Sequence, residues 1–443
     1  MFSSSAFSGG VHPRGNKNTS DCQTLLLNSF KTIRMPMLLH NGAPSVCLVK
    51  AGDKVEIGQL IGRADSPMAV PIHASVSGTV RSVAEEVAHN GQLNTVVTID
   101  NDGLATISPD IRPPSIENRA DFVKAIRESG LVGLGGAGFP TYLKMQPPAG
   151  KESNTLVINA AECEPYVTSD NRLCLEHPDE IIRGIRQVMK QMAIPRTLIG
   201  IEQNKPQAVK ALRQAIEQLQ PSDIQLVVLP TLYPQGAEKM LIYALTGRTI
   251  PSGGLPHDVG VMVLNVSTVR FINNYLLTGL PLVRRVITLD GGAVKTPGNY
   301  DVPVGVPVSD LIEAAGGLRR TVGKVLMGGP MMGIAVDRLE VSILKINNAI
   351  LVFDEAEALT PQESACIRCA RCIEVCPINL LPTSLDSMAR EKDVAGLQAD
   401  HVADCIECGC CTYVCPAKRY LVQSIRNGKA EVRAAKAKEA VRS

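Results

Sequence analysis

The chain has 443 residues, which is enough for two to four domains that each bury an apolar core. Its composition is 45% hydrophobic and 20% charged, as in ordinary globular proteins, and its net charge of +2 is too small to indicate nucleic-acid binding. No apolar run reaches the length of about 18 residues that a membrane-spanning helix needs, so we expect no such helix.

The N-terminal part of the chain predicts β-structure. Residues 1–30 are polar and irregular, and residues 31–105 hold short β-type runs broken by glycine and proline. Their regular spacing predicts a small all-β module. The stretch Pro109–Ser115 contains three prolines and is typical of a linker. The β-type runs are Ser45–Val49, Gln59–Ile61, Gly78–Val83 and Thr95–Ile99.

Residues 116–285 alternate between helical periodicity and apolar strands. This alternation predicts an α/β domain with a mostly parallel sheet. We expect helices over Asp121–Ser129, Pro178–Met192, Pro206–Leu219 and Glu238–Thr246, and strands over Thr155–Asn159, Thr197–Ile201, Gln225–Leu229 and Gly260–Asn265.

A glycine-rich loop, Gly133–Pro140, follows the first of these helices. Because it follows a helix and not a strand, it lacks the context of a Rossmann fingerprint. Dense glycines still allow a backbone to approach a ligand closely, exposed amides suit a phosphate, and Lys144 could add positive charge. The spacing alone leaves a phosphate-binding loop and a flexible turn equally open.

Two carboxylates, Glu162 and Glu164, follow the predicted strand Thr155–Asn159. The carboxyl ends of parallel strands border the ligand crevice of α/β sheets, so both side chains are well placed for binding. The alternative is a solvated acidic loop, which is the commoner occurrence of such residues.

The segment after residue 285 predicts a small α+β module. It has a strand-like run at Val286–Leu289, glycine-rich turns, and helical periodicity at Val308–Ala315. At the C-terminal end, residues 426–443 are mostly Ala, Lys, Arg and Glu and predict an exposed helix. Its basic residues could contact anionic lipid, but a solvated helix is the favoured interpretation.

Eight of the thirteen cysteines form two copies of the spacing C-x2-C-x2-C-x3-C, each followed by proline. This is the run of bacterial two-cluster ferredoxins, in which the fourth cysteine ligates the other cluster. Zinc sites are the alternative, since C-x2-C also suits zinc. We therefore expect one [4Fe–4S] cluster on Cys366, Cys369, Cys372 and Cys415 (cluster 1) and another on Cys405, Cys408, Cys411 and Cys376 (cluster 2).

The connection between the two copies favours a helical ferredoxin module over residues 355–425, because its apolar residues have helical spacing. The extra thiol Cys410 is expected to be a bystander. The remaining cysteines have no metal-ligand spacing and are expected to be packing residues: Cys22, Cys47, Cys163 and Cys174.

Two of these stretches, Gly133–Thr141 and Val157–Pro165, resemble the flavin-binding subunit of respiratory complex I. The whole chain resembles the C subunit of the Rnf-type electron-transport complex more closely. The stretches that carry this resemblance are Gly9–Pro13, Pro234–Lys239, Pro251–Pro256, Met327–Gly333 and the cysteine run as far as Cys415-Pro416.

The resemblance implies sites for FMN and NAD(H), with no catalytic residue beyond the cofactors. Ala161 stands where the complex I family has aspartate, so one hydrogen bond to the flavin is absent or supplied elsewhere. Residues 116–285 would have the complex I flavin fold, followed by a soluble-ligand-binding β-grasp domain over 286–350. FMN would be held by Gly133, Gly135, Gly136, Ala137, Gly138, Lys144, Asn159, Glu162 and Asn265, and NADH would be bordered by Phe139, Glu164 and Glu238.

The module at 31–105 resembles a lipoyl or biotinyl carrier domain of the barrel-sandwich type, through Val49–Val55 and His73–Val80. A carrier needs a lysine at its hairpin tip. The tip here, Asp65–Ala69, has none, so we expect a structural or docking role.

The resemblance implies a peripheral, NADH-facing subunit of a membrane ferredoxin:NAD+ oxidoreductase that couples electron flow to Na+ or H+ translocation at the cytoplasmic face of the cell membrane. The pump would lie in the membrane and iron–sulfur subunits of the same complex, with ferredoxin as an indirect redox partner. One alternative is a soluble flavin and iron–sulfur cobalamin reductase, which the presence of residues 1–105 argues against. The other is a plain electron carrier without flavin.

Overall fold

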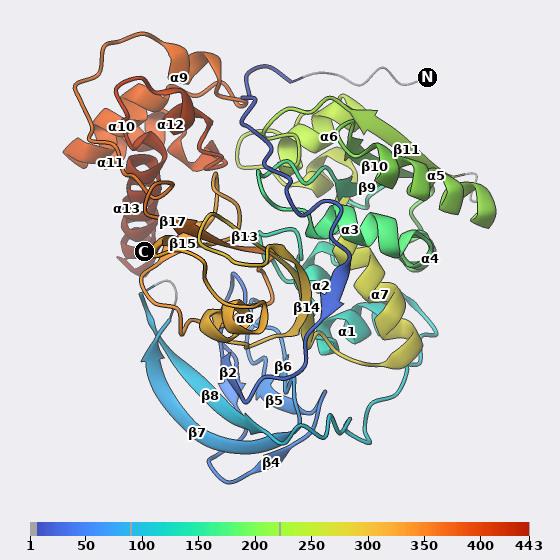
Figure 1. Cartoon of the computed structure of the whole chain (residues 1–443). Helices are drawn as coiled ribbons and strands as arrows, with labels where there is room; N and C mark the ends of the chain where they lie inside the picture. The colour runs from blue at the N-terminus through green and yellow to red at the C-terminus, as the bar shows by residue number, and fades with distance from the viewer. Residues whose placement is uncertain (1–6, 89–90, 221–222, 443) are drawn as a thin grey trace.

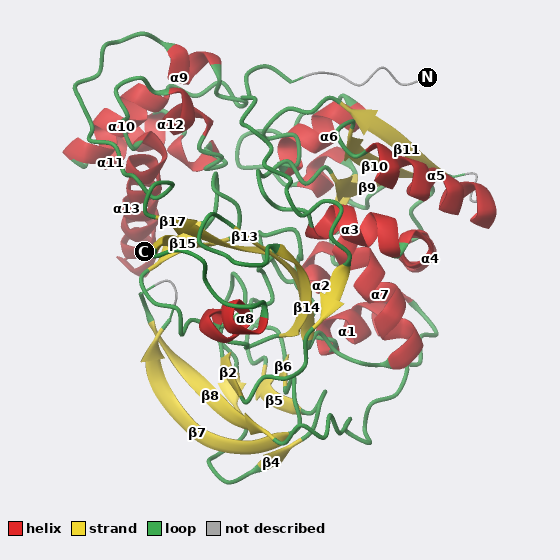
Figure 2. Cartoon of the chain, viewed as in Figure 1, coloured by secondary structure: helices red, strands yellow, loops and turns green. Residues whose placement is uncertain are grey.

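The computed structural model describes residues 7–88, 91–220 and 223–442. Residues 1–6 of the predicted N-terminal segment and residue 443 of the predicted tail lie outside this part. Four structural regions follow one another along the chain: a β-rich region, an α/β region, a second sheet, and a group of helices that forms a separate lobe (Figures 1 and 2). The predicted multidomain α/β class is confirmed.

The N-terminal β-rich region consists of two small sheets, ordered β2-β8-β7-β4 and β3-β5-β6. Its interior is continuous with the core of the second sheet, since Ile33 and Met35 pack in the same buried cluster as Val302 and Ile350. The strands are β2 (Thr32–Pro36), β3 (Val46–Cys47), β4 (Lys54–Val55), β5 (Leu60–Arg63), β6 (Ile72–His73), β7 (Gly78–Val87) and β8 (Leu93–Asn101).

The α/β region contains the predicted parallel sheet, with strand order β11-β10-β9-β12. Every residue of β10 is buried, as expected for a central parallel strand. The strands are β9 (Thr155–Ala160), β10 (Thr197–Glu202), β11 (Ile224–Leu229) and β12 (Val261–Asn265). The helices are α1 (Arg119–Glu128), α2 (Thr141–Lys144), α3 (Ser169–Glu176), α4 (Pro178–Met192), α5 (Pro206–Leu219), α6 (Glu238–Thr246), the 3-10 helix η1 (Pro256–Val259) and α7 (Val266–Thr278).

The second sheet has the order β1-β14-β13-β17-β15-β16, and Leu311 and Ile312 of a helix pack in the same core cluster as its strands. Its edge strand β1 comes from the N-terminal segment and pairs with β14 in parallel. The expectation that residues 1–30 are irregular is therefore wrong at Thr24–Leu26, because a strand this short becomes a strand only through its partner. The other elements are β13 (Arg284–Asp290), β14 (Gly298–Pro303), α8 (Val308–Ala314), β15 (Val322–Met327), β16 (Ile334–Val336) and β17 (Ala349–Asp354).

The C-terminal lobe is helical, as predicted. Its last helix, α13 (Leu421–Arg442), corrects the expectation of a wholly exposed tail, because Val432 is only 4% exposed and packs with Ile425, Leu385 and Leu397. Apolar residues of the helix join the core of the lobe, and two of its charged residues, Arg426 and Lys429, pair with Glu407 of the second cysteine loop. The remaining helices are α9 (Arg371–Glu374), α10 (Pro382–Glu391), α11 (Val394–Ala399), η2 (Val402–Asp404) and α12 (Cys410–Val414). Among the described helices, none is both long and apolar enough to cross a membrane.

The N-terminal strap, residues 9–17, runs between the helical lobe and the α/β region. The Gly10 amide donates to the Val375 carbonyl at 2.9 Å, and Val11 and Tyr233 exchange backbone hydrogen bonds of 2.8 and 3.0 Å. Gly9 and Gly10 have φ of +77° and +85°. A Cβ at Gly9 would lie 2.8 Å from the Val375 oxygen, and a Cβ at Gly10 would lie 2.8 Å from the Tyr233 oxygen. Only glycine therefore fits between the helical lobe and the α/β region at these positions.

We expect Gly10→Ala to destabilise the protein by about 1–3 kcal/mol, the usual cost of left-handed backbone at a non-glycine residue, increased by the clash with Tyr233. Thermal unfolding and limited proteolysis of the connection to the helical lobe measure this. Gly15→Ala is the matched control, since its Cβ would meet only Lys17 Cγ at 3.7 Å. Equal melting temperatures for the two variants would contradict the role given to the strap.

Candidate flavin and iron–sulfur sites

The α/β sheet changes direction between β9 and β12. From β9 the chain proceeds to β10 and β11 on one side, and then returns to place β12 on the other side. The two strands are parallel, and their last polar residues, Asn159 and Asn265, face each other in register. Ligands of open α/β sheets bind outside the carboxyl ends of the strands at such a switch point.

The glycine loop lies over this switch point. Val132 bridges Pro140, and the Gly133 amide donates to Phe139 O at 2.8 Å, so the loop is closed at its base. At its far side, a Cβ on Gly135 would lie 3.1 Å from Asn265 Nδ2. The loop therefore touches the end of β12, which the sequence alone did not establish.

The exposed part of the loop fits a phosphate-bearing ligand. Gly136 has φ +112°, and a Cβ there would meet nothing within 4 Å, so open space lies above it. Within the described residues, the amides of Gly135, Gly136, Ala137 and Gly138 donate to no protein acceptor. Unpaired amides beside open space are what an anionic group requires.

Lys144 and Glu238, one predicted for FMN and the other for NADH, are brought together. Lys144 Nζ donates to Glu238 Oε2 at 2.8 Å and to the Val263 carbonyl of β12 at 3.2 Å. Both side chains remain partly exposed, so the ion pair can open toward a ligand. Phe139 is 36% exposed.

The two asparagines at the strand ends are tied into the protein. Asn265 caps α7, accepts from the Ser267 amide at 2.8 Å, and donates to Asp170 at 2.6 Å. Asn159 donates to the Gly236 carbonyl at 2.8 Å. These contacts fix the amide groups at the edge where the ligand crevice is expected.

Glu162 and Glu164 are both engaged within the protein. Glu162 accepts from the amides of Asp170 and Asn171 at 2.6 and 3.2 Å, which satisfies donors at the start of α3. Glu164 accepts from the amides of Met331 at 3.1 Å and Met332 at 2.9 Å. Burial raises the pKa of each carboxyl group to about 7.

Three residues that support these loops carry no local sequence signal. Asn41, from the β-rich region, donates through Nδ2 to Ala137 O at 2.5 Å and through its amide to Gly138 O at 3.3 Å. Buried Arg285, from β13, donates to Leu134 O at 3.0 Å. Lys17, from the strap, donates to the carbonyls of Glu162, Glu164 and Val167 at 2.8, 2.8 and 2.6 Å.

The eight motif cysteines surround two cavities. The outer cavity has about 400 Å³ of empty space, including open solvent, and is lined by Cys366, Cys369, Cys372 and Cys415. The inner cavity has about 360 Å³ by the same measure and is lined by Cys376, Cys405, Cys408 and Cys411. Within residues 7–88, 91–220 and 223–442, no group of three or more possible ligands could hold a single metal ion. Four thiols around a larger space suit a [4Fe–4S] cluster better than zinc.

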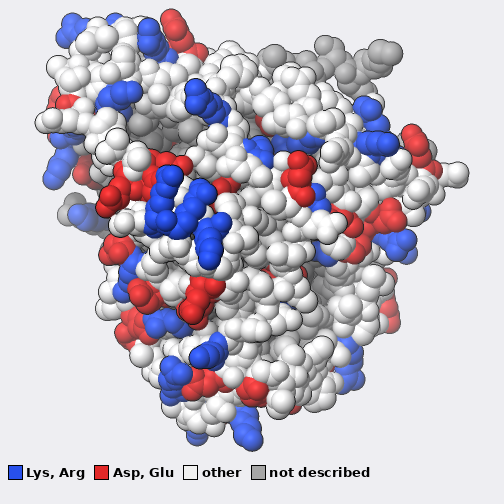
Figure 3. All heavy atoms as spheres, in the orientation of Figure 1, with Lys and Arg blue, Asp and Glu red and all other residues white. Residues whose placement is uncertain are grey.

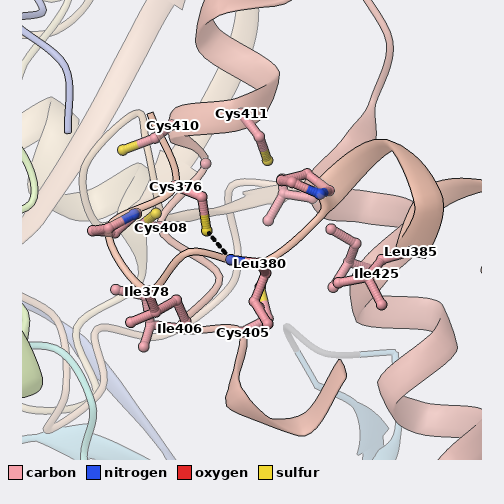
Figure 4. A pocket seen from close by; sticks show the side chains of 14 residues that line it. Cys376, Ile378, Leu380, Leu385, Cys405, Ile406, Cys408, Cys410, Cys411 and Ile425 are labelled. Carbon is pink, nitrogen blue, oxygen red and sulfur yellow. Dashed lines mark hydrogen bonds between the residues drawn. The ribbon is translucent and has the colours of Figure 1, made fainter. Parts of the chain in front are cut away.

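Figure 4 shows the inner cavity, with the sulfurs of Cys376, Cys405, Cys408 and Cys411 around it. The Leu380 amide donates to Cys376 Sγ at 3.3 Å, a contact of the kind that tunes cluster potentials. Cys410 also lines this cavity, and its thiol lies beside that of Cys408 and donates to the Tyr233 carbonyl at 3.9 Å.

The inner cavity adjoins the α/β region. The Tyr233 hydroxyl donates to Cys408 O at 2.8 Å, and Tyr233 packs in one apolar cluster with Cys408 and Cys410. Cys163, from the acidic loop after β9, and Met331 pack against the same cluster. The loop that borders the flavin site on one side therefore contacts the cluster-bearing loops on the other.

Four family models match successive parts of the chain. They are the RnfC barrel sandwich hybrid domain over residues 5–104, the Nuo51 FMN-binding domain over 126–274, the SLBB domain over 286–335 and the 4Fe-4S dicluster domain over 359–434. Each lies on one of the four structural regions described above.

Curated relatives match over nearly the whole length. The C subunit of the Na(+)-translocating ferredoxin:NAD(+) oxidoreductase complex of Acetobacterium woodii is 41% identical over 430 residues, which cover 96% of this chain and 97% of the relative. The chain belongs to this RnfC family. The C subunit of the proton-translocating complex of Clostridium ljungdahlii is 40% identical over 441 residues, covering 98% of this chain and 95% of the relative.

Solved structures share the fold. An NAD+-reducing [NiFe]-hydrogenase in its H2-reduced state superposes with a TM-score of 0.52 at 19% identity, over 72% of this chain and 64% of that chain. The air-oxidised state of an NAD+-reducing [NiFe]-hydrogenase gives a TM-score of 0.50 at 19% identity. The match covers 73% of this chain and 62% of the hydrogenase chain. Together with the matched domains, family membership assigns this RnfC chain FMN and two [4Fe–4S] clusters as cofactors.

We expect Cys369→Ala to remove cluster 1 and leave flavin binding intact, because its thiol lines the outer cavity and the glycine loop lies in another region. Iron and flavin content per chain measure the two effects. Cys410→Ala is the matched control and should keep its iron, because the expected ligands of both clusters remain and the Cys410 thiol donates to the Tyr233 carbonyl at 3.9 Å. Iron content near wild type in Cys369→Ala would refute the assignment.

We expect Gly136→Val to abolish FMN retention. A β-branched side chain would occupy the open space above the loop, at a φ that suits only glycine. Flavin released on denaturation is the measurement. Gly150→Val is the control, because Gly150 also has positive φ and open space but lies outside the loop. A folded Gly136→Val variant with full flavin occupancy would show that the loop binds nothing.

Proposed function

We infer that the chain is the NADH-facing electron-transfer subunit of an ion-translocating ferredoxin:NAD+ oxidoreductase complex, passing electrons between NAD(H), FMN and two [4Fe–4S] clusters. One observation carries this inference: the loop after β9 begins at the switch point beside Asn159 and packs against the loops of the second cysteine copy through Cys163. The two relatives are named for different ions, so the inference concerns electron transfer and not the ion that is moved.

Residues at the β9/β12 switch point would hold FMN. The unpaired amides of the glycine loop and the Lys144 ammonium group supply donors and positive charge for the phosphate. Asn159 and Asn265 present fixed amide groups, and Glu162 holds the strand-end loop in place. FMN, when bound, exchanges electrons in pairs with a nicotinamide and singly with iron–sulfur clusters, which joins the two kinds of carrier.

Phe139, Glu164 and Glu238 would border the nicotinamide. Glu238 can leave Lys144 for a ligand hydroxyl, since the pair is partly exposed. Glu164 already binds two amides of the Met327–Gly333 loop, so NADH binding would require this loop to rearrange or to share the carboxylate. The thiols of the outer cavity would hold cluster 1 and those of the inner cavity cluster 2.

We propose that the domains are 31–105 (barrel sandwich), 116–285 (FMN and NADH), 286–350 (β-grasp) and 355–425 (two clusters), flanked by segments 1–30 and 426–443. The barrel sandwich supports the flavin loop through Asn41, in keeping with the absence of a carrier lysine at its tip. The chain is one subunit of a multi-subunit complex. Its proposed partners are the membrane and iron–sulfur subunits, with ferredoxin as indirect redox partner, at the cytoplasmic face of the membrane.

NADH titration of the isolated chain tests this function: both the flavin and the clusters should be reduced, followed by visible absorbance and electron paramagnetic resonance. We expect Glu164→Gln to raise the half-saturating NADH concentration about ten- to a hundredfold, since losing a charged hydrogen bond costs about 1.5–3 kcal/mol.

Glu217→Gln, on the exposed face of α5, is the control for the change of charge and should leave NADH binding unchanged. If Glu164 serves only to bind the Met331 and Met332 amides, the variant will lose thermal stability at an unchanged half-saturating NADH concentration. That outcome would remove Glu164 from the nicotinamide site and leave the FMN assignment standing.

A further inference from the structure

The two cluster cavities differ in their exposure. Three of the four cysteines of the inner cavity, Cys376, Cys408 and Cys411, are buried, and that cavity adjoins Tyr233 of the α/β region. In the outer cavity, Cys366 and Cys369 are exposed. The chain itself covers cluster 2, whereas the cysteine loop of cluster 1 is open to another molecule.

The open loop carries basic side chains that are free of ion pairs to the chain's own carboxylates. Arg368 and Arg371 line the outer cavity, and Lys418 follows the lining residues Pro416 and Ala417. All three basic side chains are exposed and, in the described part of the chain, none of them forms an ion pair. Figure 3 shows Lys and Arg side chains along the outer edge of this lobe.

The nearby carboxylates are mostly occupied elsewhere. Glu363 pairs with Arg390 at 2.8 Å, and buried Asp386 pairs with Arg390 and Arg419 at 2.8 and 2.5 Å. Glu374, on α9, is the acidic side chain closest in sequence that has no such partner. The three cations therefore have no ion-pair partner among the described carboxylates, and only the negative charge of the thiolate-bound cluster itself would lie beside them.

An apolar side chain lies among these cations. Ile367 is 66% exposed and lines the outer cavity between Cys366 and Arg368. A hydrophobic centre with a charged rim is the usual anatomy of a protein–protein interface, and rim charges govern its rate of association and salt dependence.

We propose that the surface formed by Ile367, Arg368, Arg371 and Lys418 docks the acidic face of a partner protein that carries a one-electron redox centre. The proposal rests on the proposed function, which supplies electrons to cluster 1. One electron passes between cluster 1 and the partner's centre in either direction, and no bond or proton is exchanged. Carboxylates on the partner complement the unpaired cations, and the contact at Ile367 excludes water beside the exposed thiolates.

The test uses the full chain and membranes from cells that contain the rest of the complex but lack this subunit. The variant Arg371→Glu/Lys418→Glu reverses two charges of the surface. Lys210→Glu/Arg213→Glu makes the same change of net charge on the exposed face of α5, in another part of the molecule (Figure 1). Retention of each protein on the membranes is measured at increasing KCl concentration.

We expect wild type and the α5 control to bind equally and to dissociate as salt rises, and the surface variant to bind about tenfold or more weakly. Iron content identifies variants that have lost their clusters, and Arg371→Gln/Lys418→Gln provides a milder second variant. Binding of the surface variant equal to that of the control overturns the proposal. Equal binding of wild type to protein-free vesicles of the same lipids also overturns it, because lipid would then be the occupant.

Reduction of bound flavin by NADH, measured on the same isolated proteins, separates this proposal from the proposed function. Unchanged flavin reduction in the surface variant, together with its weaker binding, supports the docking surface. If NADH does not reduce the flavin of wild type, the proposed function fails while a salt-sensitive difference in binding still supports the docking surface.

Discussion

The arrangement of the cofactor sites depends on the close fit of the N-terminal strap between two regions of the chain. At Gly9 and Gly10 the backbone contacts Val375, next to the motif cysteine Cys376, on one side and Tyr233 on the other. There is no space for a side chain at either position. Transfer of single electrons between a flavin and a cluster requires a short and fixed separation. A strap with no room for side chains at its glycines holds the two regions at such a separation.

Charged groups also tie other regions of the chain to one another. Lys17 binds three carbonyls of the acidic loop, Arg285 binds the glycine loop, and Lys345 donates to Pro71 O and Gly130 O at 2.7 and 2.8 Å. Burial lowers the pKa of Lys345 to about 7 and that of Arg285 to about 10, which shows what their desolvation costs. Because each donor binds particular carbonyls of another region, these contacts fix the regions relative to one another. Apolar packing alone would allow these regions to shift relative to one another.

The contact between the helical lobe and the α/β region gives the two cluster sites different surroundings. The second cysteine copy is buried where it meets Tyr233, Cys163 and Met331, and it receives Cys376 from the first copy. Of the first copy, Cys366 and Cys369 lie in an exposed loop without regular structure before α9, and Cys372 lies in α9. A sequence repeat thus produces two sites with different surroundings, one facing the chain's own flavin region and the other facing outward.

Features that short stretches of residues encode could be predicted from the sequence. Helices α4, α5 and α6 have the predicted bounds, because apolar periodicity and a proline or an acidic residue in the first turn are local signals. Ligand spacing likewise predicted the two cysteine groups. Three contacts depend instead on long-range packing. The strand β1 joins β14, Asn41 and Arg285 support the glycine loop, and Glu164 binds the Met331 and Met332 amides. Even the closest of these pairs along the chain, Asn41 and Ala137, is 96 positions apart, and no periodicity or spacing within either partner records where the other will lie.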